Sequence, residues 1–406
     1  MRVLLVGSGG REHALAWKLT QSPTMGELHA APGNPGIARL GQCHPVRAED
    51  GEGLLDLAVD LSADLVVIGP EAPLVAGVGD ELRHAGISVF GPGHGAARLE
   101  GSKSFAKDVM LAAGVPTART LAVARPPCVL KADGLAAGKG VFVCRSQSEL
   151  DAALPAAASF GGRLVIEELL EGGEVSLLAL ADGREVVALP PAQDYKRLED
   201  GDRGPNTGGM GSLSPVPDLD PNAVEEMLET VHRPVLAELA ARDTPFVGVL
   251  FAGLMLTAEG PRVLEFNCRF GDPETQSIVP LLEGDLLAAL AAAAAGELAG
   301  VELPAASGAA VTVVLAAEEY PADGDAGTPI AGVDEAEAAG ALVFHSGTAL
   351  RDGRLVTNGG RVLGVTGLGE TLAEAREAAY DAARQIRFRG ARMRTDIARK
   401  AGALHG

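Results

Sequence analysis

Short apolar runs that end in glycine- or proline-rich loops recur through the first hundred residues. Residues 3–6 and 65–68 are continuous apolar runs, and two further short runs, at 28–30 and 87–90, each contain one polar residue (His29 and Ser88). Continuous apolar runs of this length are typical of strands buried on both faces, as in a parallel sheet. The stretches between them fit helices, the first over about residues 11–20. The pattern predicts an open parallel α/β sheet over residues 1–101, with ligands bound at the carboxyl ends of its strands.

The rest of the chain mixes strands and helices without that repeat. Further strands are predicted at residues 128–133, 141–143, 246–256, 263–270, 311–315, 341–345 and 361–366. Further helices are predicted at residues 103–113, 221–241, 281–298 and 371–387. The strands at 246–256 and 263–270 are joined by a short turn and predict a hairpin. We therefore expect an α/β and α+β multidomain protein whose last segment, residues 301–406, is α+β.

Period-two alternation is most informative in residues 263–276, a predicted strand that runs into a tight loop. One strand face carries Glu265, Asn267 and Arg269, and the other is apolar, with Leu264, Phe266, Cys268 and Phe270. Carboxylate and amide oxygens suit Mg²⁺, and a guanidinium suits a phosphate or carboxylate. An ordinary half-exposed strand would also alternate. The polar face has no threonine, serine or lysine, and more carboxylates follow it, which favours a metal–phosphate site.

Charge and composition restrict the possible partners. The 406 residues carry a formal net charge of −20, so nucleic acid and anionic membranes are not expected to bind. No apolar run approaches the roughly 20 residues needed to span a bilayer, and no signal peptide precedes the first strand. The four cysteines lack Cys-x-x-Cys spacing, which is typical of buried thiols in a reducing compartment. We expect a cytoplasmic protein.

Lysines are scarce, and two of the seven lie around a glycine-rich segment between two predicted strands. Lys131 precedes residues 134–140, which contain three glycines and Lys139. This composition favours a flexible phosphate-binding flap over a solvated turn. The next strand leads into an acidic loop at residues 164–174. That loop offers backbone groups for an adenine and carboxylates for a ribose, but the pattern is unspecific and, taken alone, favours a solvated acidic loop.

The first glycine-rich turn, residues 7–10, lies between a predicted strand and helix. Backbone N–H groups at a helix start attract anions, so the turn is a candidate phosphate cradle. A simple tight turn explains it as well. It is not the dinucleotide fingerprint, because Glu12 stands where the third glycine of G-x-G-x-x-G belongs. A dehydrogenase is therefore disfavoured.

Five segments together resemble one enzyme family. They are Gly-Ser-Gly-Gly-Arg-Glu-His-Ala at 7–14, Gly-Pro-Glu-Ala-Pro-Leu at 69–74, Lys-Ala-Asp-Gly-Leu-Ala-Ala-Gly-Lys-Gly at 131–140, the glycine-rich residues 204–211, and Arg-Phe-Gly-Asp-Pro-Glu-Thr-Gln at 269–276. The chain resembles the glycinamide ribonucleotide synthetase family of ATP-grasp enzymes over essentially its whole length. The string at 269–276 is the most specific of these segments.

The resemblance implies ligation of glycine to 5-phosphoribosylamine with ATP, through a glycyl-phosphate intermediate, in purine biosynthesis. It implies ATP and Mg²⁺ or Mn²⁺ as cofactors, and a monomer that binds only small molecules. It also implies a substrate-binding domain at 1–101, an ATP-grasp domain at 102–300 with a lid at about 117–177, and a C-terminal domain at 301–406. The rival hypotheses are a biotin-dependent carboxylase subunit and a nucleotide-sensing binding protein. No biotin-accepting Met-Lys-Met occurs in the chain.

The resemblance also implies roles for individual residues. Arg269, Lys139 and Asp272 are the expected catalytic residues, and Glu265 and Asn267 the expected metal ligands. ATP is expected to bind at Lys103, Lys131, Lys139, Glu167, Glu168, Leu170 and Glu174. The substrates are expected to bind at Gly9, Gly10, Glu71, Asp194, Lys196, Asn206, Arg269, Gly271, Asp272 and Arg361.

Overall fold

The N-terminal segment folds as a parallel five-stranded sheet in the computed structural model, which describes residues 1–135, 140–217, 219–305 and 307–399. The strand order is β3-β2-β1-β4-β5. The strands are β1 (Arg2–Gly7), β2 (Glu27–Pro32), β3 (Gln42–Cys43), β4 (Leu65–Ile68) and β5 (Val89–Phe90). The helical elements are α1 (Gly10–Leu19), η1 (Ile37–Arg39), α2 (Gly51–Asp60), α3 (Glu71–Ala76), α4 (Val78–His84) and α5 (His94–Gly101). Residues 3–6 are completely buried, which confirms the prediction from their apolar run.

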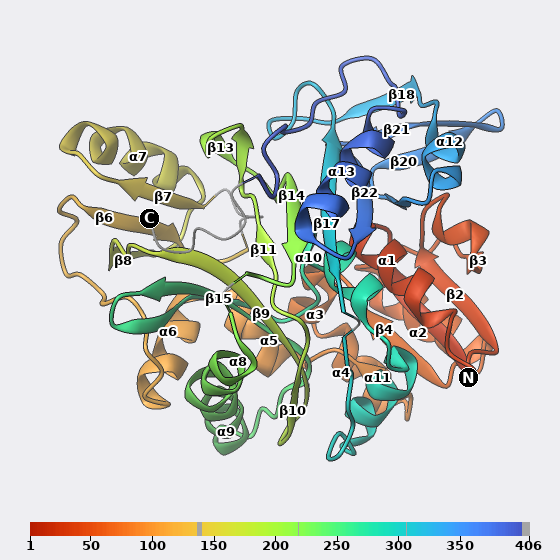
Figure 1. Ribbon diagram of the computed structural model, residues 1–406. Helices are drawn as coiled ribbons and strands as arrows, with labels where there is room; N and C mark the ends of the chain where they lie inside the picture. The colour runs from red at the N-terminus through yellow and green to blue at the C-terminus, as the bar shows by residue number, and fades with distance from the viewer. Residues whose placement is uncertain (136–139, 218, 306, 400–406) are drawn as a thin grey trace.

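A small antiparallel sheet lies on the opposite side of the molecule from the N-terminal sheet (Figure 1). Its order is β7-β6-β8, with β6 (Cys128–Ala132), β7 (Val141–Cys144) and β8 (Leu164–Glu168). Helix α7 (Gln147–Ser159) packs on it and shares a separate small hydrophobic core with it. Helix α6 (Lys103–Ala112) precedes this unit. We call β6, β7, β8 and α7 the lid sheet unit.

The central sheet has the order β10-β9-β15-β16 and is antiparallel. It comprises β9 (Gly173–Asp182), β10 (Val186–Ala188), β15 (Val247–Thr257) and β16 (Gly260–Asn267), so the predicted hairpin is confirmed. Before β15 the chain is helical from residue 221 to 241, as α8 (Pro221–Met227), the π-helical η2 (Leu228–His232) and α9 (Arg233–Ala241). The wider turn ends two residues before Pro234, which lacks the N–H that a regular α-helix needs.

The last large sheet combines strands from two distant parts of the chain. Its order is β11-β14-β17-β22-β19. The strands are β11 (Gln193–Asp194), β14 (Gly211–Ser214), β17 (Ala309–Ala316), β22 (Arg361–Gly369) and β19 (Leu342–His345). The hairpin β12 (Arg197–Glu199) and β13 (Arg203–Asn206) lies between β11 and β14 in the sequence. The C-terminal sheet therefore includes two strands from the middle of the sequence.

Smaller elements complete this part of the fold. A second C-terminal sheet is formed by β18 (Asp325–Pro329), β21 (Arg354–Gly359) and β20 (Thr348–Arg351). The remaining helical elements are α10 (Glu274–Ile278), η3 (Val279–Leu281), α11 (Leu286–Ala295), α12 (Val333–Ala338) and α13 (Leu372–Ala383). The mixed α/β and α+β class predicted from the sequence is confirmed.

Two predicted helices are shorter than expected because local signals end them. The helix expected at 281–298 is α11, which starts after its N-cap Asp285 and ends at Gly296, a residue with a φ of +75°. The helix expected at 371–387 is α13, with Thr371 as its N-cap. It ends early because the backbone of Arg387 instead pairs with Ala331 at 2.8 Å.

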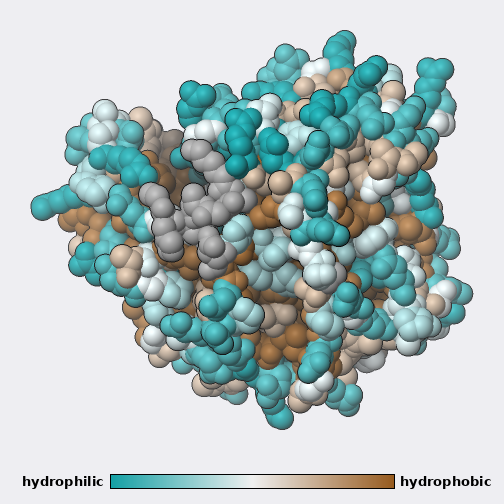
Figure 2. All heavy atoms as spheres, in the orientation of Figure 1, coloured by the Kyte–Doolittle hydropathy of each residue, from teal (hydrophilic) through white to brown (hydrophobic). Residues whose placement is uncertain are grey.

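Hydrophilic side chains cover much of the face drawn in Figure 2, with hydrophobic areas between them. Within the described part of the chain, the exposed large hydrophobic side chains are spread over several elements: Val59, Leu111, Val123, Leu135, Leu154, Phe160, Leu350 and Leu368. Among the described residues, no helix has both the length and the apolar character required to cross a membrane.

Candidate active site

Strand β16 carries the predicted metal ligands, and a bulge changes which of its residues face the core. The pairing with β15 shifts by one residue, and Leu264 is the extra residue. Val263 is consequently the fully buried residue, and Leu264 is half-buried. The expectation that Leu264 shares the core-facing side is therefore wrong. Beyond the bulge the alternation holds, with Glu265 and Asn267 partly exposed and Cys268 buried.

Glu265 and Asn267 together offer one carboxylate and one amide oxygen. Burial alone would raise the pKa of Glu265, but the ammonium groups of Lys196, Lys131 and Lys103 outweigh it and lower the pKa. Asn267 Oδ1 accepts a hydrogen bond from Arg269 Nη2 at 3.3 Å. Across residues 1–399, leaving aside the undescribed positions, no cluster of three or more His, Cys, Asp or Glu side chains is arranged to hold a metal. Two hard oxygens fit Mg²⁺, which commonly takes one or two protein ligands and substrate phosphates.

Arg269 lies just beyond the end of β16 between two carboxylates of the N-terminal segment. Its Nε donates to Glu71 Oε2 at 3.2 Å, and its Nη2 is 2.9 Å from Glu100 Oε1. These carboxylates outweigh burial and raise the pKa of Arg269, so the guanidinium stays charged. Glu71 was predicted from the sequence, but Glu100 was missed. A single glutamate at the end of a helix gives no sequence signal of its partner 169 positions later.

Three lysines of the site are already paired with protein groups. The buried Glu167 carboxylate forms ion pairs with Lys107 Nζ and Lys131 Nζ, each at 2.6 Å. Lys131 Nζ also donates a hydrogen bond to the Leu264 carbonyl at 2.7 Å. Lys103 Nζ donates to the Gly134 carbonyl at 2.8 Å. Lys107 was not among the predicted site residues. The predicted Lys139 lies outside the described residues.

The predicted nucleotide-binding carboxylates have different environments. Glu167 is buried, whereas Glu168 pairs with the exposed Arg119 at 2.8 Å. Leu170 is half-buried. Glu174 pairs with Lys196 at 3.1 Å, and that ammonium also lies 3.7 Å from Glu265. The acidic loop is therefore linked through Lys196 to Glu265, one of the two predicted metal ligands.

Lys196 is surrounded by carboxylates at the centre of the site. Burial would lower its pKa, but Glu174, Asp194 and Glu265 raise it well above its ordinary value. Burial raises the pKa of Asp194 to about 8; Lys196 opposes this shift and Glu274 adds to it. Predicted residue Asn206 lies at the edge of this region, where its Nδ2 donates to the Val141 carbonyl of β7 at 3.3 Å.

The predicted glycine cradle at the start of α1 is tightly packed. Gly9 N–H donates to Glu12 Oε2 at 2.6 Å, and Gly10 N–H donates to Ser346 Oγ at 3.2 Å. A Cβ on Gly10 would lie 2.6 Å from Gln276 Nε2, so any other residue there would displace the Gln276 amide. Ser346, from the C-terminal segment, was not predicted. The two predicted N–H donors are thus occupied by protein acceptors in this conformation.

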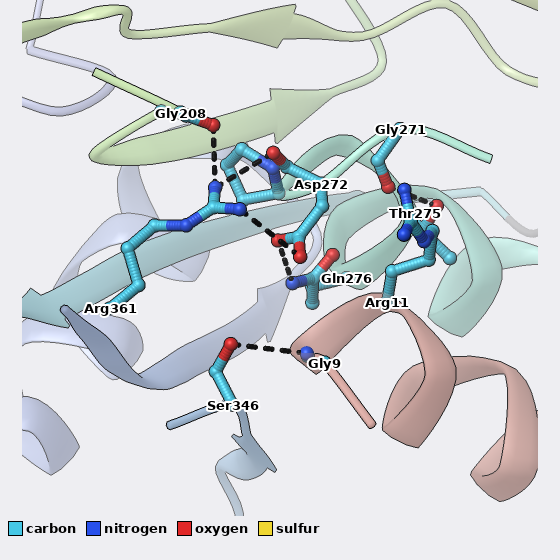
Figure 3. A network of polar contacts seen from close by, with 12 residues as sticks. Gly9, Arg11, Gly208, Gly271, Asp272, Thr275, Gln276, Ser346 and Arg361 are labelled. Carbon is cyan, nitrogen blue, oxygen red and sulfur yellow. Dashed lines mark hydrogen bonds and ion pairs between the residues drawn. The ribbon is translucent and has the colours of Figure 1, made fainter. Parts of the chain in front are cut away.

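Asp272 and Arg361 join the central and C-terminal segments beside this turn (Figure 3). Arg361 Nη2 lies 3.2 Å from Asp272 Oδ2, and its Nη1 donates to the Asp272 carbonyl at 2.8 Å and to the Gly208 carbonyl. Gln276 Nε2 donates to the other Asp272 oxygen at 2.8 Å. Burial would raise the pKa of Asp272, but Arg361 and the other cations outweigh it and lower the pKa. The structure thus brings the predicted Asp272, Arg361 and glycine turn together.

Gly271 lies between Arg269 and Asp272, and its carbonyl accepts the Thr275 hydroxyl at 2.6 Å. A Cβ on Gly271 would come within 2.5 Å of Glu274 Oε2. A larger residue at this point would have to displace the Glu274 carboxylate and press on the Phe251 ring.

Comparison with known proteins places the chain in a family. Family models described as phosphoribosylglycinamide synthetase match it, with the N domain at residues 1–100, the ATP-grasp (A) domain at 101–275 and the C domain at 310–400. Phosphoribosylamine–glycine ligase of Streptomyces coelicolor is 51% identical and that of Rhizobium meliloti is 48% identical. Each alignment covers 99% of this chain and 99% of the relative.

Solved structures agree with these matches. The crystal structure of phosphoribosylamine–glycine ligase from Thermotoga maritima is 38% identical, with a TM-score of 0.85, and the match covers 98% of this chain and 100% of that one. The biotin carboxylase domain of the Hydrogenobacter thermophilus 2-oxoglutarate carboxylase gives a TM-score of 0.70 at 17% identity, covering 97% of this chain and 91% of that one. The second similarity shows a shared fold alone. With three family models matching most of its residues, the chain belongs to the phosphoribosylglycinamide synthetase family of ATP-grasp ligases.

Proposed function

We propose that the protein ligates glycine to 5-phosphoribosylamine, converting ATP to ADP and phosphate and forming glycinamide ribonucleotide in purine biosynthesis. The observation that carries the proposal is the grouping of Glu265, Asn267 and Arg269 at the end of β16, with the Asp272–Arg361 pair following closely. Family membership and the names of the relatives support the choice of substrates. The division into domains at 1–101, 102–300 and 301–406, with a lid at about 117–177, is part of this proposal.

Glu265 and Asn267 are the residues that would hold Mg²⁺ or Mn²⁺ together with nucleotide phosphates. The bound cation would neutralise negative charge on the phosphoryl group during transfer. The partial exposure of both side chains and the low pKa of Glu265 support this assignment, because a ligand carboxylate must be ionised. The lysines Lys103 and Lys131, with Lys139 from the flap, would bind phosphates. Glu168, Leu170 and Glu174 would bind adenine and ribose.

The reaction then proceeds in two displacements. A carboxylate oxygen of glycine attacks the γ-phosphorus of ATP, the bond to the ADP oxygen breaks, and glycyl phosphate forms. The nitrogen of phosphoribosylamine next attacks the glycyl carbonyl carbon, and the bond from that carbon to the phosphate oxygen breaks. Arg269 would stabilise the charge on the acyl phosphate, and the amine loses a proton as the amide forms. Since acyl phosphates hydrolyse, closure of the lid sheet unit over the site would exclude water.

Two histidines at the edge of this region do not favour a phosphohistidine route. His13 and His345 lie in separate segments of the sequence, but in the structure the backbone N–H of His345 donates a hydrogen bond to His13 Nδ1 at 2.8 Å. Both rings are buried, and burial lowers the pKa of His13 to about 3 and that of His345 to about 4. Asp272, the other candidate, is paired with Arg361. Direct attack by the substrate carboxylate therefore requires the fewest rearrangements.

An isotope experiment tests the proposal. Glycine labelled with ¹⁸O in its carboxylate should transfer one labelled oxygen to inorganic phosphate in each turnover, and ADP release should require both glycine and phosphoribosylamine. Unlabelled phosphate would show that water or a protein group accepted the phosphoryl group. ADP release that ignores both substrates would contradict the assigned function.

A further inference from the structure

Glu100, at the end of the N-terminal segment, contacts the loop after β16 that carries Arg269. It lies in the last turn of α5, and its side chain is only 7% exposed. One carboxylate oxygen lies 2.9 Å from Arg269 Nη2, and the other accepts the backbone N–H of Cys268 at 2.8 Å. A single carboxylate thus contacts both the guanidinium and the backbone that carries it, which restricts both ends of a long flexible side chain.

The other contacts of Arg269 differ from this one in exposure and geometry. Glu71 bonds Nε at 3.2 Å, but its side chain is 31% exposed. Nη1 donates to the Phe270 carbonyl at 3.2 Å, and Nη2 donates to Asn267 Oδ1 at 3.3 Å. Glu100 is the most buried of the charged partners and lies closest to the guanidinium. It is therefore the contact least able to be replaced by water or by a substrate anion.

Arg269 favours the ionised form of Glu100. Burial raises the pKa of Glu100, and the nearby guanidinium opposes this shift. The Glu100 carboxylate also favours the charged form of Lys103, which lies three residues along the chain. Glu100 therefore contacts one cation, and favours the charged form of a second, that the proposed function assigns to phosphate groups.

We propose that Glu100 is a positioning residue that fixes the guanidinium of Arg269 at the place where the acyl phosphate forms. This inference rests on the proposed function, because it assumes that Arg269 acts on that group. Preorganised charge is effective because it needs no reordering during the reaction. An arginine without this anchor would retain its charge, but its guanidinium would occupy several orientations, so catalysis would suffer more than substrate binding.

The test compares three variants. Glu100→Gln keeps the shape and one acceptor oxygen but removes the charge, and Glu100→Asp keeps the charge on a shorter stem. Glu337→Gln is the control, because Glu337 also forms a close ion pair with an arginine, Arg39, at 2.9 Å, and that pair includes no residue assigned to the site. We expect Glu100→Gln to lower kcat about 100-fold with little change in the KM for ATP. Glu100→Asp should recover part of this loss, and Glu337→Gln should match the unmodified protein.

A double substitution separates positioning from a structural role. If Glu100 acts through Arg269, Glu100→Gln should cause almost no further loss of kcat in an Arg269→Lys background. Equal losses in both backgrounds, or an unchanged kcat for Glu100→Gln alone, would overturn the inference. If Glu100→Gln does not fold, Glu100→Asp replaces it in the same comparison. Failure of the unmodified protein to release ADP with glycine and phosphoribosylamine would instead refute the proposed function.

Discussion

Replacement of Glu167 by glutamine is expected to destabilise the fold by about 3–5 kcal/mol, the usual cost of removing one partner from a buried ion pair. The carboxylate is 4% exposed and lies 2.6 Å from both Lys107 Nζ and Lys131 Nζ. Glutamine has one acceptor oxygen, so one ammonium would face an amide NH₂ group. Burial already lowers the pKa of Lys107, and Glu167 is the largest influence opposing that shift.

Urea unfolding at pH 7, followed by circular dichroism, measures this loss. The neighbouring Glu168→Gln is the matched control, because Glu168 pairs with an arginine whose side chain is 77% exposed. An exposed pair of that kind contributes less than about 1 kcal/mol. Hydrogen exchange across β8 would show whether the loss is local to the lid sheet unit or extends to the whole fold.

Equal small losses in the two variants would refute the reasoning. That result would mean that water reaches the two ammonium groups and stabilises them without the carboxylate. A large loss in Glu168→Gln with none in Glu167→Gln would reverse the assignment of the buried carboxylate. Measurement of both variants at the same pH and salt keeps the comparison direct.

Two further predictions concern the site, and a third concerns three buried histidines. Glu265→Gln and Asn267→Ala should each weaken Mn²⁺ binding in the presence of a non-hydrolysable ATP analogue by at least about 10-fold, measured by electron paramagnetic resonance, and unchanged binding in both would contradict the metal assignment. Arg361→Ala should raise the KM for phosphoribosylamine while sparing that for ATP, and an equal rise in both would argue against a role in binding the ribose phosphate. Stability should fall below pH 6.5, because His13, His232 and His345 are buried with folded pKa values of about 3, 4 and 4 and must remain neutral. Each buried histidine should lower the free energy of unfolding by about 2 kcal/mol at pH 5 and by almost nothing above pH 7. A free energy of unfolding that stays constant from pH 7 to pH 5 would contradict this prediction.

Local patterns were sufficient where neighbouring residues decide the outcome. The apolar run at residues 3–6 predicted a buried strand because both faces of a parallel strand are covered. Alternation placed Glu265 and Asn267 on the same side of β16. The helix over residues 103–113 was located to within one residue, because its cap Ser102 and the following Gly114 lie next to it in the sequence. The family was identifiable from motifs of six to ten residues.

Only the tertiary structure decided which distant groups meet. The bulge at Leu264 arises from pairing with β15, and strands β11 and β14 join the C-terminal sheet although they precede it by about a hundred residues. The contacts of Glu100 with Arg269 and of Gly10 with Ser346 likewise join residues far apart in the chain. A carboxylate or hydroxyl has the same local signature whether it lies in solvent or beside a buried cation. Its partner is determined by how separate segments pack, and no pattern within one segment records that arrangement.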